Sequence, residues 1–142
     1  MEMIKGLLDE KRLETFKVAR AQIAKHIESA FQDLKEARTT FPVSDKAAYL
    51  FAYTAMLKIG RALLFLKGYR PKGQGQHETV VKVAGFTLGK DFESLTRQFN
   101  LMRQKRNKLI YDIGGVVSHE EAEKAFAAAE KYLEDVQQFM KK

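Results

Sequence analysis

Cysteine is absent from the 142-residue sequence, and proline occurs only twice, at Pro42 and Pro71. Without cysteine the chain has no disulfide, no thiolate nucleophile and no cysteine–zinc site. The three histidines, His26, His77 and His119, stand far apart and lack the local spacing of metal ligands. We therefore expect neither a metal ion nor a cofactor. With so few prolines, helices can continue over long stretches.

A secretory signal is not expected, because no basic run followed by a long apolar core appears near the N-terminus. The most apolar stretch, residues 47–66, contains Lys58 and Arg61 near its middle. Each of these charges would cost about 2.5–3.5 kcal/mol at the centre of a bilayer. We therefore interpret the stretch as a buried core helix and expect a cytoplasmic protein that does not enter a membrane.

Helical periodicity dominates the rest of the chain. Hydrophobic residues make up 45% and charged residues 30%, as in ordinary globular proteins. Apolar residues recur at three- and four-residue spacing, which predicts long helices over residues 10–37, 45–67, 91–111 and 118–140, with a short one near 80–85. Ser44, Asp91 and Ser118 are the expected N-caps, and Ser118 with Glu121 fits a capping box. The fold class expected is all-α: a single domain over residues 1–142, forming an antiparallel up-and-down bundle of four long helices plus a short helix.

Positive charge is concentrated in the middle third of the chain. The net charge is +7, yet residues 58–108 alone contain twelve basic and three acidic residues, a local excess of +9. An excess of this kind attracts polyanions, above all the phosphates of nucleic acids. A solvated face that keeps the protein soluble is the alternative interpretation.

The helix expected over residues 91–111 contains one residue that does not fit its pattern. Its apolar stripe includes Phe99 and Met102, and the next position on that stripe is Arg106. A guanidinium buried without partners is very costly, so Arg106 must pair with a carboxylate, reach out to solvent or line a cleft. Asn107 lies four residues from Tyr111, so these two are neighbours on one helix face.

Two segments resemble the HEPN superfamily. Residues 103–112, RQKRNKLIYD, resemble its signature helix, in which an arginine and a following polar residue precede a histidine. Residues 53–71, YTAMLKIGRALLFLKGYRP, resemble the helix before it, and His77 stands where many relatives carry a loop histidine. The resemblance extends over about residues 19–140.

The resemblance implies a helical bundle that dimerises through the motif face. Many members are metal-independent ribonucleases, some act as toxins beside a small nucleotidyltransferase, and others bind only nucleotides or RNA. In active members, arginine and histidine from both subunits meet at the scissile phosphate. This chain differs at one position, because Tyr111 stands where the histidine would be. Tyrosine has an ordinary pKa near 10 and is a poor general base at neutral pH.

These observations favour a HEPN-like homodimer that binds RNA or nucleotide phosphate in a basic cleft, and the resemblance adds a small nucleotidyltransferase as a candidate partner. The candidate catalytic residues are the motif positions Arg106, Asn107 and Tyr111, and the expected phosphate-binding residues are Arg103, Arg61, Arg70, Lys72 and His77. One alternative is an active ribonuclease, in which Tyr111 or His77 replaces the missing histidine. Another is a non-catalytic helical interaction protein.

Overall fold

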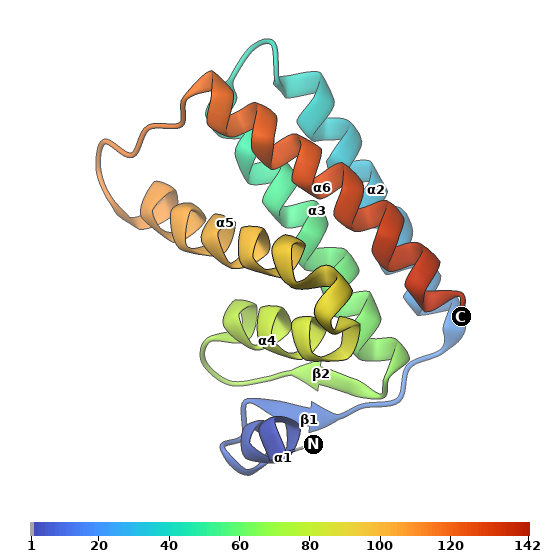
Figure 1. Ribbon diagram of the computed structural model, residues 1–142. Coiled ribbons are helices and arrows are strands. Elements are labelled where there is room, and N and C mark those ends of the chain that lie inside the picture. The colour runs from blue at the N-terminus through green and yellow to red at the C-terminus, as the bar shows by residue number, and fades with distance from the viewer. Residues whose placement is uncertain (1) are drawn as a thin grey trace.

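The computed structural model describes residues 2–142 as an all-α helical bundle with one very small sheet (Figure 1). This confirms the expected fold class. In chain order the elements are α1 (Glu2–Asp9), β1 (Leu13–Thr15), α2 (Arg20–Thr40), α3 (Asp45–Leu66), β2 (Tyr69–Pro71), α4 (Gln76–Leu88), the 3-10 turn η1 (Lys90–Phe92), α5 (Glu93–Tyr111) and α6 (His119–Met140).

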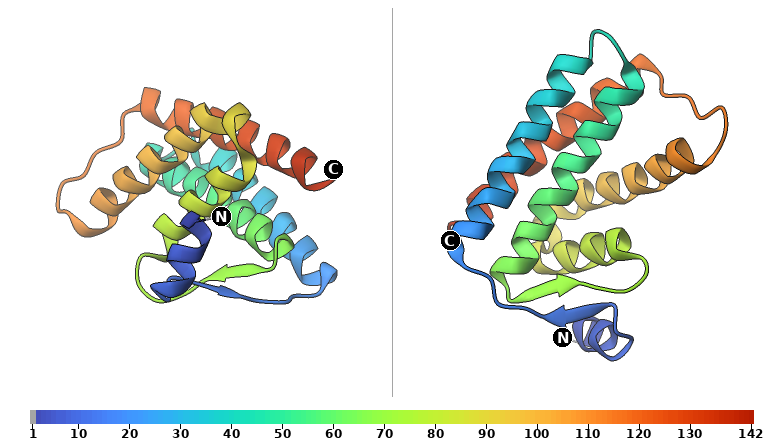
Figure 2. Two further views of the ribbon diagram at one scale, coloured as in Figure 1. Left: turned by 60° about the horizontal axis from the view of Figure 1, so that its bottom comes forward. Right: turned by 180° about the vertical axis from the view of Figure 1, so that it is seen from behind.

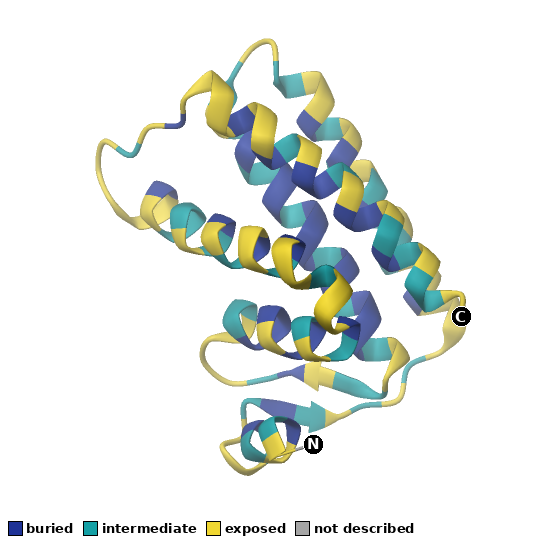
Figure 3. Cartoon of the chain, viewed as in Figure 1, coloured by how far each residue is buried: buried dark blue, intermediate teal, exposed yellow. Residues whose placement is uncertain are grey.

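Helix α3 is the centre of the bundle. Helices α2 and α6 run alongside it, while α5 crosses it obliquely and α4 lies near its C-terminal half (Figures 1 and 2). Twelve of the 22 residues of α3 are buried, so it is enclosed on most sides (Figure 3). By length and composition α3 is apolar enough to cross a membrane, but most of that apolar stretch packs inside the bundle. The prediction of a core helix at this place is therefore confirmed.

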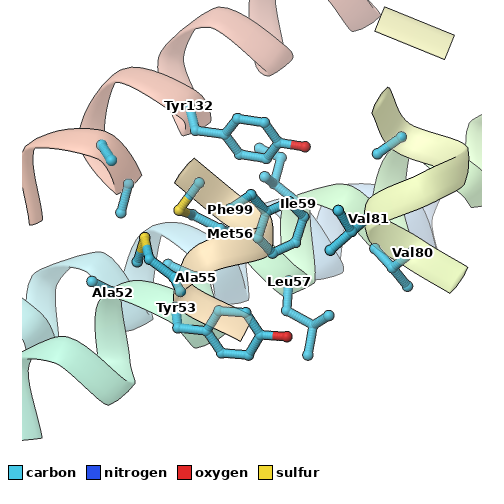
Figure 4. Close-up of a cluster of buried hydrophobic side chains, with 14 of the residues drawn as sticks. Ala52, Tyr53, Ala55, Met56, Leu57, Ile59, Val80, Val81, Phe99 and Tyr132 are labelled. Atoms are coloured by element: carbon cyan, nitrogen blue, oxygen red, sulfur yellow. The ribbon is translucent and has the colours of Figure 1, made fainter. Parts of the chain in front are cut away.

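Three aromatic rings join the helices at the core. The ring of Phe99 on α5 lies 5.8 Å from that of Tyr53 on α3 and 5.3 Å from that of Tyr132 on α6, measured between centroids (Figure 4). Such contacts add to the burial of each side chain, which is worth about 1.5–3 kcal/mol. Where α3 meets α4, Gly60 has no room for a side chain, because a Cβ there would lie 2.8 Å from Cγ1 of Val80. This packing fixes α4 and α5 relative to α3.

Two of the three expected helix caps are present. The Ser44 hydroxyl accepts a hydrogen bond from the backbone N–H of Ala47, and Ser118 forms a complete capping box with Glu121. The prediction for Asp91 is wrong. Asp91 lies inside the 3-10 turn η1, and α5 begins two residues later without a side-chain cap.

The expected helix over residues 10–37 is also wrong in its first part. After α1 the chain turns at Lys11, which has a positive φ of 59°, and Leu13–Thr15 pairs antiparallel with Tyr69–Pro71. Backbone hydrogen bonds extend this pairing on both sides, from Phe16 N–H to Gly68 O and from Lys72 N–H to Arg12 O. The sheet satisfies backbone groups that a continuous helix would have bonded internally.

A further correction concerns the segment between β2 and α4. The sequence predicts only a short helix near residues 80–85, but α4 already begins at Gln76, after Gly75 in a left-handed conformation. His77 and Glu78 therefore belong to the first turn of a 13-residue helix. This rigid placement directs both side chains toward α5.

Candidate functional site

A cleft of about 430 Å³ lies between the first turn of α4 and the C-terminal half of α5. Helix α5 contributes Arg103, Arg106, Asn107 and Tyr111, and α4 contributes His77 with its neighbours Gly75, Gln76 and Glu78. We call this space the motif cleft. The helical spacing of the α5 residues and the early start of α4 bring together five of the eight site residues expected from the sequence.

Arg106 lines the motif cleft instead of pairing in the core. Its Nη1 donates a hydrogen bond to Oδ1 of Asn107 at 3.3 Å. No carboxylate among residues 2–142 lies within ion-pair distance of its guanidinium, although the residue is half-buried. An uncompensated charge in such a position favours an anion as its partner.

Arg103 and Arg12, which lies in the N-terminal segment, contact the same carboxylate, that of Glu78. Its Nε donates to Oδ1 of Asn100 at 3.0 Å, and its Nη2 lies 3.7 Å from Oε2 of Glu78. The other oxygen of Glu78 accepts a 2.9 Å hydrogen bond from Arg12. The hydrogen bond from Arg12 is the main reason why the pKa of Glu78 is lowered, with Lys82 and Arg103 adding to the effect. Glu78 thus stays ionised at the rim of the motif cleft.

His77 is neutral at neutral pH. Its Nδ1 lies 3.0 Å from the hydroxyl oxygen of Tyr53. Burial, followed by the positive charges of Arg106, Arg61 and Arg103, lowers the pKa of His77 to about 4. Burial also raises the pKa of Tyr53 to about 12, so this hydroxyl keeps its proton. When Nδ1–H donates to Tyr53, Nε2 of His77 is free to accept a proton.

The remaining expected phosphate-binding residues lie elsewhere. Arg61 and Arg70 line a second cavity of about 290 Å³, and Gln76 is the residue that this cavity shares with the motif cleft. Lys72 lines neither space, and its Nζ lies 3.3 Å from Oε2 of Glu14. Glu14 also accepts a hydrogen bond from Arg70, which is the main cause of the lowered pKa of Glu14. Arg70 and Lys72 therefore already have an anionic partner.

Several residues that shape the site were not identified from the sequence. Tyr53 falls within the expected core helix and is buried, but its hydroxyl also contacts His77. Arg12 and Glu78 form an ion pair across 66 residues of sequence. Spacing carries no signal for such a contact, because it depends on where β1 meets β2. Gly75 before Gln76 is a weak helix-start signal that was available.

The chemistry of the motif cleft is that of anion binding. It combines two guanidiniums, two carboxamides, a neutral imidazole and the exposed phenol of Tyr111, with the carboxylate of Glu78 at the rim. Within residues 2–142, no group of three or more histidine or carboxylate side chains is placed to hold a metal ion. Guanidiniums suit phosphate because their fixed N–H groups can donate two parallel hydrogen bonds.

Comparison with known proteins gives one match, which is to a family model. No curated protein matches the chain significantly, and no solved structure does so. The family model described as "HEPN domain" matches residues 23–139, which is most of the chain and includes the motif cleft. The match begins after α1 and β1, so these two elements lie outside it. On the strength of this match and of the helical bundle that carries the arginine motif, the chain belongs to the HEPN family.

Proposed function

We propose that this protein binds RNA or nucleotide phosphate in the motif cleft. The observation that carries the proposal is the half-buried Arg106, which has no carboxylate partner among the described residues and faces the same space as Arg103 and His77. Family membership supports a role connected with RNA or nucleotides. The local excess of positive charge over residues 58–108 supports attraction of a polyanion.

Binding of a labelled single-stranded RNA, measured by fluorescence anisotropy at several salt concentrations, tests this proposal. Loss of one charged hydrogen-bonding group costs about 1.5–3 kcal/mol, so Arg106→Gln should weaken binding by roughly 10- to 100-fold. The slope of log affinity against log salt should also become shallower by about 0.7, the value for one phosphate contact on a single strand.

The matched control is Arg97→Gln on the same helix. Arg97 is exposed and pairs with Glu93, four residues away, at 3.2 Å. This variant loses the same net charge without touching the motif cleft, so its RNA affinity should stay close to wild type. Equal losses in the two variants would show that binding depends only on overall charge, and the proposed site would be rejected.

A homodimer is part of the proposal. Exposed apolar side chains flank the motif cleft, among them Leu101, Ile110, Tyr111 and Ile113. A separate groove of about 790 Å³ between α4 and α5 extends this surface past the half-exposed Phe86. Burying such a surface against a second copy would remove it from water. Light scattering should give twice the mass of one chain, and Leu101→Lys should shift the protein toward the monomer.

Ribonuclease activity is the second candidate, and the position of His77 favours it. In metal-independent cleavage the 2′-oxygen forms a bond to phosphorus while the bond to the 5′-oxygen breaks. His77 Nε2 would take the proton of the 2′-hydroxyl, and the leaving 5′-oxygen would take one from water. Arg103 and Arg106 would stabilise the charge that develops on the phosphate oxygens. A bound phosphate would also raise the pKa of His77 and make it a better base.

Incubation of the purified protein with RNA in EDTA tests this second candidate. The expected products carry a 2′,3′-cyclic phosphate and a 5′-hydroxyl, and His77→Gln should abolish them while RNA binding persists. Tyr111→His, which places the family's histidine in the motif, should increase the rate. Cleavage that is unaffected by both His77→Gln and Arg106→Gln would indicate a contaminating nuclease and would reject the candidate.

The partner and the compartment stay predictions. A small nucleotidyltransferase is expected from the family resemblance alone, and co-purification from the native host tests it. A stable complex without any RNA affinity in the isolated protein would favour a non-catalytic interaction protein instead. Cytoplasmic localisation is checked by fractionation of the host cells.

A further inference from the structure

The second cavity, of about 290 Å³, is built differently from the motif cleft. It lies between the start of α2, the C-terminal part of α3 and β2, and its walls include Phe16, Gln22, His26, Arg61, Phe65 and Arg70. We call it the Arg61 cavity. Phe16 and Gln22 precede the residues that match the family, so part of its wall lies outside the matched range.

Arg61 carries an uncompensated charge into this cavity. The chain has eight arginines, and five of them form ion pairs with carboxylates, namely Arg12, Arg38, Arg70, Arg97 and Arg103. Of the other three, Arg20 is exposed, whereas Arg61 and Arg106 are half-buried. Neither Arg61 nor Arg106 has a carboxylate partner within residues 2–142. Arg106 lines the motif cleft and Arg61 lines the Arg61 cavity, so each space contains one guanidinium that is unpaired among the described residues.

Burial makes the charge of Arg61 costly. It is the main reason why the pKa of Arg61 is lowered, and no hydrogen bond to the guanidinium is formed by any other described side chain. A guanidinium in this position gains most from an anion that enters the cavity and accepts several of its N–H groups. Phosphate has the geometry and the charge for this contact.

Aromatic rings form the other part of the cavity. The rings of Phe16 and Phe65 lie 5.8 Å apart, and those of His26 and Phe65 lie 4.9 Å apart. Arg70 holds its guanidinium 4.1 Å above the ring of Phe16. Both phenylalanines are only half-buried, so ring surface remains available. Stacked aromatic and guanidinium groups are the usual partners of an unpaired nucleobase.

Polar groups suited to a base edge are also present. Gln22 offers a carboxamide that both donates and accepts hydrogen bonds. Burial, together with Arg61 and Lys58, lowers the pKa of His26, so its imidazole is neutral and also has one donor and one acceptor. The volume is near the lower end of ligand pockets, which begin at about 300 Å³, and fits one nucleotide rather than a longer segment.

We propose that the Arg61 cavity is a nucleotide pocket, in which Arg61 binds a phosphate group and the rings of Phe16 and Phe65 stack on the base. It deepens the proposed function without depending on the motif cleft. The nucleotide can be a free mononucleotide or one residue of an RNA strand. Gln76 borders both spaces, so the motif cleft and the Arg61 cavity adjoin. An RNA strand bound in the motif cleft would therefore lie next to this pocket.

Calorimetric titration with AMP, adenosine and inorganic phosphate tests the proposal on the full chain. AMP should bind more tightly than adenosine or phosphate, because only AMP fills both halves of the pocket. Arg61→Gln should weaken AMP binding at least about tenfold. Phe16→Leu should weaken it at least about fivefold, since stacking of a base contributes about 1–3 kcal/mol. Arg97→Gln should leave the AMP affinity unchanged.

Two arms separate the sources of the nucleotide and the two cavities. Arg106→Gln should keep AMP binding and lose RNA binding, so failure of the motif cleft as an RNA site would leave the AMP result intact. A short RNA that displaces AMP and is weakened by Arg61→Gln identifies a strand nucleotide, whereas RNA that leaves AMP bound identifies a free nucleotide. Phe16 lies at the surface of the bundle, so Phe16→Leu serves if Arg61→Gln fails to fold. The proposal is overturned if AMP does not bind, or if binding survives both substitutions.

Discussion

His77 reports directly on the charge of the motif cleft, and its titration can be predicted in detail. Four causes lower its pKa from 6.5 to about 4, in the order burial, Arg106, Arg61 and Arg103. Arg106→Gln removes the second cause and leaves the first. The pKa should therefore rise and still remain below 6.5. Because burial is the larger cause, removing the charge of Arg106 should restore only part of the lowering.

Long-range proton–nitrogen NMR of the imidazole rings measures this value. The chain has only three histidines, so substitution of His26 and His119 assigns the signal of His77. Arg97→Gln is the control, because Arg97 is not among the charges that act on His77. Added RNA should raise the pKa by neutralising the guanidiniums. A wild-type pKa at or above 6.5, or the same pKa in Arg106→Gln as in wild type, would refute the geometry of the motif cleft.

Three further predictions concern stability, each measured by urea unfolding. Unfolded His77 takes up a proton near pH 6.5, whereas folded His77 does so only near pH 4. The free energy of unfolding should therefore fall as the pH falls through this window, by about 1–2 kcal/mol after allowance for partial exposure. The variant His77→Gln should show a smaller fall. Gly60→Ala should destabilise the fold by about 1–3 kcal/mol, because the new Cβ would collide with Val80. Gly6→Ala should stabilise it by about 0.5–1 kcal/mol, because the new Cβ meets nothing closer than 3.9 Å. Ser118→Ala should cost about 1 kcal/mol by removing the capping box, and an unchanged midpoint would contradict that role.

Sequence reasoning worked best where a local pattern decides the structure. The stripe that ends in Arg106 left three possible surroundings for its guanidinium, and the structure places it at a cleft. The four-residue spacing predicted Asn107 and Tyr111 on one face of α5, and both line that cleft. Ser118 and Glu121 form a capping box within one turn, so their contact can be read from the chain directly. The four long helices of the bundle follow from the same local periodicity.

Sequence reasoning failed where a contact with a residue far away in the chain decides the structure. Leu13–Thr15 has apolar and polar residues that fit either a helix or a strand, and its pairing with β2 across more than 50 residues made it a strand. For the same reason Arg61 and Arg106 looked like members of one basic cleft, although each lines a cavity of its own. Linear charge density cannot reveal which cations the fold pairs with Glu14 and Glu78 and which it leaves unpaired.

The shared carboxylate of Glu78 has a consequence for selectivity. Arg12 holds one of its oxygens and Arg103 lies near the other, so an incoming anion competes with a negative group that already occupies part of the entrance. We expect small monovalent ions such as chloride to lose this competition, while a polyphosphate or an RNA strand displaces the carboxylate from Arg103. The charge that an anion needs to displace Glu78 would then depend on Arg12, which lies beside β1 and outside the residues that match the family. Arg12→Gln would change this requirement, because Glu78 would be free to turn fully toward Arg103.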